Sequence, residues 1–166
     1  MMTVRRIRSG DGASLREVRL RALDSDPDAF GSTYEREVSH TEDEWERRAQ
    51  SSAAGPDNFI VVGEAGPGFL GMAGAFSRAE TPGVRNLYGM WVAPEARESG
   101  VGERLVGEIV GWSEDVGAAE VRLWVVESNL AAVRLYEKAG FTPTGETQAL
   151  PSNPELVEMR MRITLT

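Results

Sequence analysis

A strand–helix–strand unit in the second half of the chain is the feature that most constrains its fold. Residues 87–92 are predicted to be a strand that Pro94 ends, and residues 100–116 carry one broad apolar stripe at helical spacing. Residues 121–125 then alternate between apolar and polar side chains, as a strand does. Because a whole helix joins the two strands, we expect them to be parallel, with a right-handed crossover. An open sheet binds its ligand at the ends of such strands.

The other segments predict a mixed α/β fold around this unit. A capping box at Thr41 and Glu44 marks the start of one helix. The predicted helices outside the unit are residues 15–23, 42–49 and 130–139. The predicted strands outside it are residues 4–8, 59–62, 69–76, 141–147 and 157–165, with turns at 66–68 and 81–83. In the last strand every second residue is apolar, and Glu158, Arg160 and Arg162 lie on its opposite face.

The charge balance and the missing residue types argue against several kinds of chemistry. With 18 Lys and Arg against 26 Asp and Glu, the net charge of −8 argues against broad nucleic-acid binding, which needs a basic face. The absence of Cys removes disulfides, thiolate catalysis and Cys-bound metals, and a single His argues against a Ser/His/Asp triad or a multi-His zinc site. We therefore expect no metal and no nucleic-acid partner.

The length and the distribution of apolar residues bound the organisation of the chain. A length of 166 residues fits a single domain over residues 1–166. No apolar run approaches the roughly 20 residues of a membrane-spanning helix, and no secretory signal is visible at residues 1–10. We expect a cytoplasmic protein with no membrane partner.

Two glycines open the helix of the crossover unit, in the segment Arg97-Glu-Ser-Gly100-Val-Gly102. Glycines allow a tight turn that exposes successive backbone N–H groups at a helix N-terminus, where the helix dipole favours an anion. The segment lacks the Lys-Ser/Thr of a P-loop, and Leu105 stands where a dinucleotide fingerprint has its third glycine. The alternative interpretation is a glycine turn that only starts a helix.

A second motif follows the strand that ends near residue 126. The pattern N-x-x-A-x-x-L-Y-E-x-x-G-F runs from Asn129 to Phe141. Asn129 stands where a helix N-cap is expected, and Gly140 is typical of the residue that follows the end of a helix. Tyr136 projects beside the packing face of this helix, and taken alone it is equally well explained as a core aromatic residue.

Together, in this order and spacing, the two motifs resemble those of the GNAT superfamily of acyl-coenzyme A N-acyltransferases. The resemblance is strongest over residues 87–141 and extends more loosely over the whole chain. It implies a mixed α/β fold with a central, mostly antiparallel sheet, a parallel strand pair at the cofactor site and about four helices. It also implies acetyl-CoA as cosubstrate and an amine as acceptor. A homodimer is possible, because relatives are often dimers.

The resemblance carries particular residues over to this chain. Residues 90–92 would pair through their backbone with the pantetheine arm, and residues 97–102 would hold the pyrophosphate through backbone N–H groups. Asn129 would contact the pantetheine region, and Tyr136 would stand near the thioester sulfur as the general acid. The predicted cofactor-binding residues are thus Met90, Trp91, Val92, Arg97, Glu98, Ser99, Gly100, Val101, Gly102 and Asn129.

The implied reaction is direct attack of a neutral amine on acetyl-CoA, without an acyl-enzyme. With a phenol pKa of about 10 against about 8.5 for a thiol, full proton transfer is uphill by about 2 kcal/mol, so a hydrogen bond from Tyr136 matters more than complete protonation. Many family members carry Glu or Asp on the strand that matches residues 87–92, and this chain does not. His40 is expected at the surface. The candidates for the base are Tyr88, Glu35, Glu37 and a water chain.

The sequence leaves the acceptor open. Residues 24–48 hold nine Asp and Glu against three Arg. These carboxylates either form a solvated face or steer a cationic amine, such as a polyamine or an amino sugar, to the site. Phe30, Tyr34 and Trp45 either wall the acceptor pocket or pack the first two helices together.

Three functions and one alternative fold remain compatible with the sequence. The first is acetylation of a small-molecule amine. The second is acetylation of a protein, at an N-terminal amine or at Lys, which needs an open groove. The third is a non-catalytic acyl-CoA-binding module, and the last is an unrelated α/β fold whose motifs are coincidental.

Overall fold

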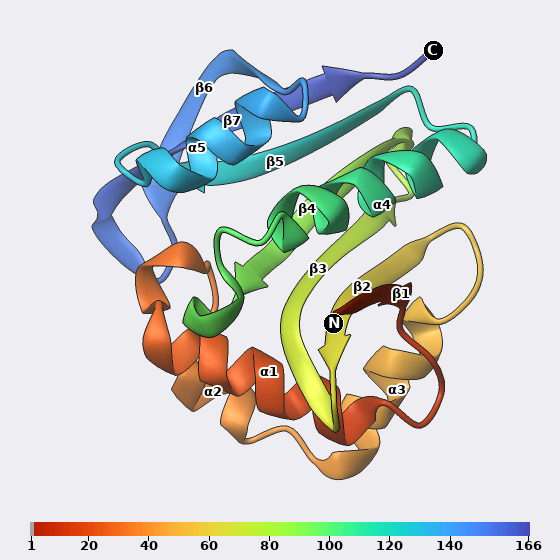
Figure 1. Cartoon of the computed structure of the whole chain (residues 1–166). Coiled ribbons are helices and arrows are strands. Elements are labelled where there is room, and N and C mark those ends of the chain that lie inside the picture. Colours follow the sequence, from red (N-terminus) through yellow and green to blue (C-terminus); the bar gives the residue numbers. More distant parts are fainter. Residues whose placement is uncertain (1) are drawn as a thin grey trace.

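A computed structural model describes residues 2–166, which form one seven-stranded sheet with helices on both faces (Figure 1). The order of strands in the sheet is β1-β2-β3-β4-β5-β7-β6. The strands are β1 (Thr3–Arg6), β2 (Asn58–Ala65), β3 (Gly68–Arg78), β4 (Thr81–Val92), β5 (Glu120–Val126), β6 (Thr142–Leu150) and β7 (Asn153–Thr164). The α-helices are α1 (Gly12–Ser25), α2 (Tyr34–Val38), α3 (Glu42–Ser52), α4 (Val101–Asp115) and α5 (Leu130–Lys138).

The crossover predicted from the sequence is confirmed. Strands β4 and β5 are joined through α4 and pair in parallel, whereas every other pair of neighbouring strands is antiparallel. The fold is therefore the mixed, mostly antiparallel α/β fold that the resemblance implied. Within residues 2–166 there are five α-helices rather than about four, because the five-residue α2 forms where Thr33 accepts a hydrogen bond from the N–H of Arg36.

Two hydrophobic cores lie on opposite faces of the sheet. On one face, α4 and α5 cover the sheet, and Leu105, Val106 and Ile109 of α4 are completely buried. On the other face, α1 and α3 bury Leu23 and Trp45 against β2 and β3. Each fully buried side chain of this size contributes about 1.5–3 kcal/mol of transfer free energy, so these faces fix the sheet between the two helical layers.

One predicted turn is wrong. Residues 81–83 lie inside the first part of β4, and Arg78 pairs with Thr81, so the chain reverses at Ala79 and Glu80. The sequence Thr-Pro-Gly is typical of a turn, but a proline is also tolerated close to the start of a strand. Because β4 begins earlier than expected, it is 12 residues long.

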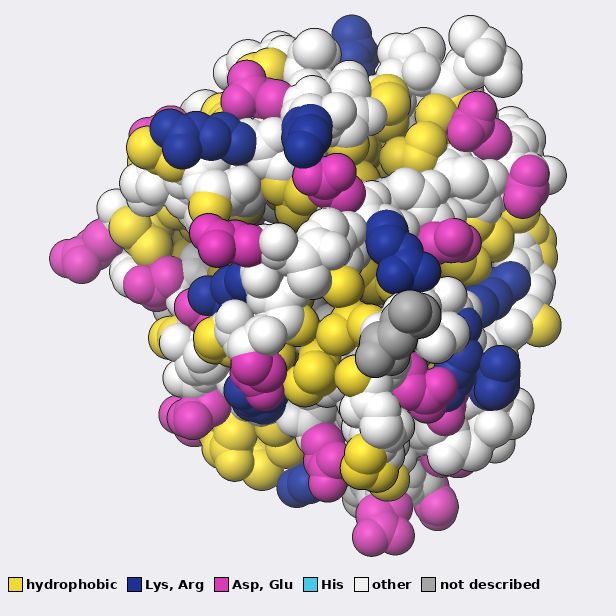
Figure 2. Space-filling model, in the orientation of Figure 1, with side chains coloured by type: hydrophobic (Ala, Val, Ile, Leu, Met, Phe, Trp, Pro, Cys, Tyr) yellow, Lys and Arg dark blue, Asp and Glu magenta, His cyan; other side chains and the backbone are white. Residues whose placement is uncertain are grey.

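Charges of both signs are interspersed over the face that carries α4 and α5 (Figure 2). Among the helices of residues 2–166, none combines the length and the apolar character needed to cross a membrane.

Candidate functional site

Strands β4 and β5 separate at one end of the sheet, and the gap between them is the centre of the candidate site. Their parallel pairing begins at Val84 and Glu120 and ends at Leu87 and Leu123. Beyond that point β4 continues to Val92 and β5 to Val126 with no pairing between them. The unpaired edges present backbone N–H and C=O groups to the gap, which is a place where an extended ligand can add as another strand does.

A β-bulge in β4 causes this separation. Tyr88 pairs with Gly74 and Trp91 with Met72, so Gly89 and Met90 together stand opposite Ala73. Gly89 has a φ of 64°, a conformation that glycine adopts without steric cost. The extra residue bends β4 away from β5, as bulges next to active sites often do.

The glycine segment between β4 and α4 exposes a row of backbone amides. Gly100 has a φ of 83° and Glu98 a φ of 62°, so the chain turns twice through the left-handed region before α4 starts. Among residues 2–166, no backbone carbonyl accepts a hydrogen bond from the amides of residues 98–102. A non-glycine residue in this conformation costs about 1 kcal/mol or more, and such strain is found where a binding loop is held in a fixed shape.

Gly102 allows this amide row to lie close to the gap. A Cβ atom at Gly102 would come within 3.2 Å of the Met90 side chain and 3.4 Å of Leu135. The N-terminus of α4 therefore packs directly on the bulged part of β4 and on α5. The amide row and the bulged part of β4 are therefore neighbours.

The predicted residues of β4 and its following loop are partly engaged within the protein. The indole of the buried Trp91 donates a hydrogen bond of 2.7 Å to Asp26. Arg97 donates to the Val92 carbonyl at 2.9 Å and to Asp26 at 3.1 Å, so its side chain holds the loop against β4. The hydroxyl of Ser99 donates to the carbonyl of Ala96 within the same turn. Backbone amides, rather than these side chains, are the free groups of the loop.

The second motif lies on the opposite side of the gap. Asn129 accepts a hydrogen bond from the N–H of Ala132 at 3.3 Å, which confirms it as the N-cap of α5. Tyr136 is 5% exposed and belongs to the core under α4 and α5, with its ring edge-to-face against Phe141. Burial raises the pKa of the Tyr136 phenol, so the group keeps its proton at neutral pH and remains a hydrogen-bond donor.

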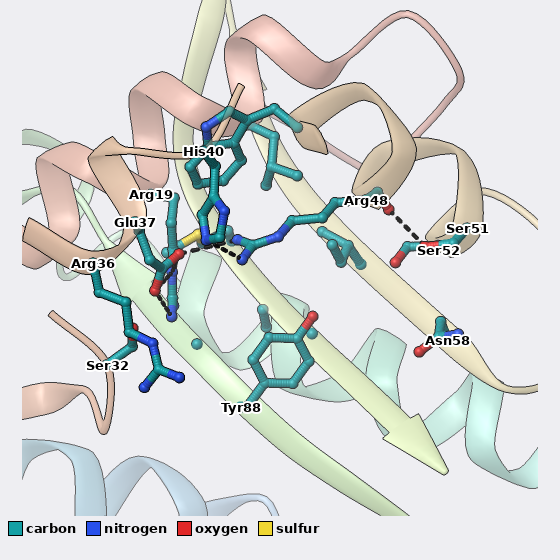
Figure 3. Close-up of a pocket in the computed structure, with 17 residues that line it drawn as sticks. Arg19, Ser32, Arg36, Glu37, His40, Arg48, Ser51, Ser52, Asn58 and Tyr88 are labelled. Atoms are coloured by element: carbon teal, nitrogen blue, oxygen red, sulfur yellow. Dashed lines mark hydrogen bonds and ion pairs between the residues drawn. The ribbon is translucent and has the colours of Figure 1, made fainter. Parts of the chain in front are cut away.

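A first cavity of about 550 Å³ lies on the other face of the sheet, between α1, α2, α3 and the bulge (Figure 3). Glu37 of α2 projects into it and is held by Arg19 at 2.9 Å and Arg48 at 3.0 Å. Burial favours the neutral form of Glu37, but the two guanidinium groups outweigh this and lower its pKa to about 2. Glu37 is therefore a poor base, although the sequence made it a candidate.

His40 and Tyr88 line the same cavity (Figure 3). His40, expected at the surface, keeps 27% of its side chain exposed. Its ring contacts Trp45 edge-to-face and bonds to Glu44 at 3.0 Å and Arg48 at 3.1 Å. Arginine can only donate, so Nε2 of His40 accepts and Nδ1 carries the proton. The surrounding protein desolvates the Tyr88 hydroxyl and raises its pKa, although 40% of the residue is exposed, and Arg19 and Arg48 oppose this rise. Tyr88 is therefore a neutral phenol rather than an anionic base.

A second cavity of about 550 Å³ adjoins the first and lies over β4, β5 and β7. Arg19, Ser32, Tyr88 and Gly89 line both cavities, so the two form one continuous hollow beside the bulge. Glu158 also lines the second cavity and is 7% exposed. Burial raises the pKa of Glu158, and a hydrogen bond of 2.5 Å from Gln148 opposes this rise.

Sequence reasoning missed Glu158 as a candidate base. The alternation of β7 placed Glu158 and Arg160 opposite the apolar face, which is correct, but that second face is a cavity wall. Because this sheet has helices on both faces, a polar residue on either face of an inner strand is covered rather than exposed to solvent. A glutamate at such a position is the signal that could have identified Glu158. Glu35, another candidate base, is exposed and lines neither cavity.

The acidic segment at residues 24–48 has structural roles in several places. Glu46 accepts hydrogen bonds from the N–H groups of Gly10 and Gly12, and Glu44 completes the capping box of α3. Of the nine acidic side chains only Glu37 lines the two cavities, where it is ion-paired. The segment therefore does not give the cavities a negative charge.

The aromatic residues of the first helical segment have different positions. Trp45 is buried between α1 and α3 and also lines the first cavity, whereas Phe30 lines the second. Tyr34 lies outside both. Within residues 2–166, no group of three or more His, Asp or Glu side chains is arranged to hold a metal ion.

Comparison with known proteins agrees with this geometry. The fold matches an acetyltransferase of the GNAT family from Streptococcus pneumoniae with a TM-score of 0.85 and 20% identity, covering 100% of both chains. It also matches a Salmonella typhimurium protein solved with its cofactor acetyl-CoA (TM-score 0.79, 19% identity, 100% of this chain and 95% of the other). A spermidine N-acetyltransferase from Vibrio cholerae, in complex with CoA and spermine, matches with a TM-score of 0.75 and 18% identity over 98% of this chain and 95% of that one.

Sequence relatives and a family model show the relationship directly. A mycothiol acetyltransferase from Thermobispora bispora is 33% identical over 108 residues, which are 63% of this chain and 36% of that protein. The chain spans between about a quarter and a half of the length of the first curated relatives that it matches. The model of the acetyltransferase (GNAT) family matches residues 20–141, which is most of the chain. The protein therefore belongs to the acetyltransferase (GNAT) family.

Proposed function

We propose that the protein transfers an acetyl group from acetyl-CoA to the primary amine of a small molecule, by direct attack and without an acyl-enzyme. The observation that carries this proposal is the gap between β4 and β5 beyond Leu87 and Leu123. A row of free amides lies beside this gap on one face of the sheet, and a hollow lies on the other face. Two reactants that enter from opposite faces meet at this gap.

The residues around the gap fit an acyl-CoA. The amides of residues 98–102 suit a pyrophosphate, because they point free N–H groups from a helix N-terminus. The edge of residues 90–92 that faces the gap is not paired with β5 and suits the amide groups of pantetheine, although Arg97 already occupies the Val92 carbonyl. The side-chain N–H₂ of Asn129 is free to donate after its oxygen has capped α5. When bound, acetyl-CoA supplies the thioester that the amine attacks.

Three groups of the chain would serve the reaction. A backbone N–H of residues 90–92 would stabilise the negative charge that develops on the carbonyl oxygen. Tyr136 would donate a hydrogen bond to the departing thiolate, and its raised pKa favours this role over complete proton transfer. Glu158, whose pKa is raised by burial, would receive the proton that the attacking amine loses. The acid and the base would act from opposite faces of the sheet.

The size of the hollow favours a small molecule over a protein as acceptor. Each cavity holds about 550 Å³, which is typical of sites for small ligands, and α1, α2 and α3 cover the first of them. A protein acetyltransferase needs an open groove along which a peptide can lie. Acetylation of a protein N-terminus or Lys is the second candidate, and a non-catalytic acyl-CoA-binding module is the third.

Release of free thiol from acetyl-CoA, measured across a panel of amines, tests the proposal. It is measured beside calorimetric binding of acetyl-CoA alone. Binding together with turnover of a small amine is the expected result. Binding without turnover of any amine or peptide would favour the non-catalytic module, and absence of binding would contradict the assignment of the amide row. We also propose that residues 1–166 form a single domain and that the protein is a cytoplasmic homodimer. Light scattering tests the dimer.

A further inference from the structure

The hollow on the α1–α3 face is cationic, although the protein as a whole is acidic. Its two cavities are lined by six arginines and two glutamates, whereas the net charge of the chain is −8. Arginine carries its positive charge throughout the physiological pH range. The arginines are Arg19, Arg36, Arg48, Arg78, Arg122 and Arg160.

The charges of Arg122 and Arg160 are poorly compensated within the protein. Arg19 and Arg48 already share Glu37, but within residues 2–166 no carboxylate lies within ion-pair distance of Arg122. Arg160 has only the exposed Glu146, at 3.7 Å. The Nε atoms of both Arg122 and Arg160 are buried and have no hydrogen-bond partner within the described chain. A buried donor without a partner destabilises a protein, and a bound acceptor oxygen would offset this cost.

The surroundings of Arg122 and Arg160 hold their side chains in place. The guanidinium of Arg160 lies 4.5 Å above the ring of Trp124, its cross-strand partner. Arg122 stands directly opposite Arg162 on β7, and like charges in opposite positions destabilise a sheet. An anion between Arg122 and Arg160 would compensate the charge of Arg122 and meet two planar groups that suit a carboxylate.

The cationic pair lies next to the point where β4 and β5 separate. Arg122 and Trp124 flank Leu123, the last residue of β5 that pairs with β4. Glu158 follows on the same face of β7, two residues and therefore about 7 Å from Arg160. The two guanidinium groups and the Glu158 carboxyl group thus lie close together next to the gap.

We infer that the acceptor is an amino acid, whose carboxylate binds Arg122 and Arg160 and whose amine lies toward Glu158. This inference rests on the proposed function and names its substrate class. The acidic residues 24–48 suggested a polyamine or an amino sugar as the acceptor. A polyamine would bring further positive charge next to the arginines, and an amino sugar has no anionic group for them to bind. The net charge of −8 does favour cations at long range, but screening limits that effect to about 8–10 Å, so the nearby arginines decide what binds.

The test compares amino acids with their primary amides, which lack the carboxylate. Methionine, phenylalanine and serine are each paired with the corresponding amide, and kcat/KM is measured by thiol release from acetyl-CoA. The amide has the less basic amine, so intrinsic reactivity favours the amide. We expect the opposite order, with the free acid preferred by roughly 10–100-fold, as two charge-assisted hydrogen bonds to the carboxylate provide. The kcat/KM of phosphoethanolamine, compared with that of ethanolamine, shows whether a phosphate serves in place of a carboxylate. The kcat/KM of spermidine tests the alternative that the acceptor is a cation without an anionic group.

Variants assign the preference to the two arginines. Arg122→Gln and Arg160→Gln should each lower kcat/KM for the acids by roughly tenfold or more and change it less than about threefold for the amides. Arg162→Gln is the matched control, because Arg162 is an exposed neighbour that lines neither cavity. Calorimetry with acetyl-CoA shows that the variants remain folded and bind the cosubstrate.

Two results would overturn the inference while leaving the proposed function intact. One is turnover in which amides or spermidine equal the free acids. The other is an equal loss on acids and amides in both arginine variants, which would indicate a structural role. Absence of turnover with every amine, by contrast, would contradict the proposed function itself and the acceptor class with it.

Discussion

Leu87 and Leu123 form the last pair between β4 and β5, and the separation of the strands begins directly after them. Each side of this pair has a different environment. Both leucine side chains belong to the core under α4 and α5, while the neighbouring Tyr88, Arg122 and Trp124 face the cavities on the other side. The core on the α4–α5 face is therefore continuous up to Leu87 and Leu123. Beyond this pair, a bound ligand would take the place of the backbone hydrogen bonds that β4 and β5 no longer make with each other.

Tyr136→Phe tests the proposed role of the phenol in stabilising the thiolate. We expect kcat to fall by roughly 100-fold, because the donor is removed, and the Kd for acetyl-CoA to change less than about twofold. The ring should keep its edge-to-face contact with Phe141, so the thermal midpoint should be unchanged. Steady-state kinetics with calorimetry measure both quantities. A variant with the same kcat as the native protein would remove Tyr136 from the reaction.

Gly100→Ala tests whether the amide row binds the cosubstrate. An alanine at a φ of 83° is strained by about 1–2 kcal/mol, and relief of that strain would turn the amides of residues 98–102 away from the pyrophosphate. We expect the Kd for acetyl-CoA to rise roughly tenfold. Gly107→Ala, on an exposed face of the same helix where a Cβ has open space, should stabilise the protein by about 1 kcal/mol and leave binding unchanged. Equal binding by the two variants would contradict the assignment.

Local signals in the sequence predicted the parts of this site that depend on neighbouring residues. The capping box of Thr41 and Glu44, the N-cap at Asn129 and the crossover through α4 all form as expected. Gly140 follows α5 with a φ of 105°, the conformation expected for a residue after a helix end. Each of these features is decided within a few residues along the chain, which is why one sequence suffices to predict it.

Features that depend on distant contacts could not be predicted in the same way. The bulge at Gly89 and Met90 is defined by its register against β3, which no local pattern encodes. Arg160 and Glu158 were correctly placed opposite the apolar face of β7, but alternation does not say what covers the second face. The polar neighbours of His40 agree with its partial exposure, but they do not indicate the contact with Arg48, eight residues away, that fixes its ring in the cavity wall.

Glu37→Gln tests the ion pairs that close the first cavity. The folded-state pKa of Glu37 is about 2 against an ordinary value of 4.5, so its charge stabilises the fold above pH 4.5, and this contribution is lost as pH falls toward 2. We expect the variant to lose about 3 kcal/mol of unfolding free energy at pH 7 and less than half of that at pH 3. Denaturant titrations at the two pH values measure the difference. Glu35→Gln, an exposed neighbour without an ion pair, should show no loss at either pH, and a pH-independent loss in Glu37→Gln would argue against the ion pairs as its cause.

Glu158→Gln should move stability and activity in opposite directions. Burial raises the folded-state pKa of Glu158, so the ionised carboxylate destabilises the fold as pH rises through that pKa. Glutamine removes this cost and can still bond to Gln148, so the variant should have a higher thermal midpoint than the native protein at pH 7, and the difference should shrink toward pH 4. If Glu158 receives the proton of the amine, kcat/KM should fall by roughly 100-fold or more at the same time. Glu155→Gln, an exposed position on the same strand, should change neither quantity. A stabilised variant with full activity would confirm that the charge is buried and would exclude Glu158 as the base. A gain in stability together with a loss of turnover is expected only of a residue that serves the reaction.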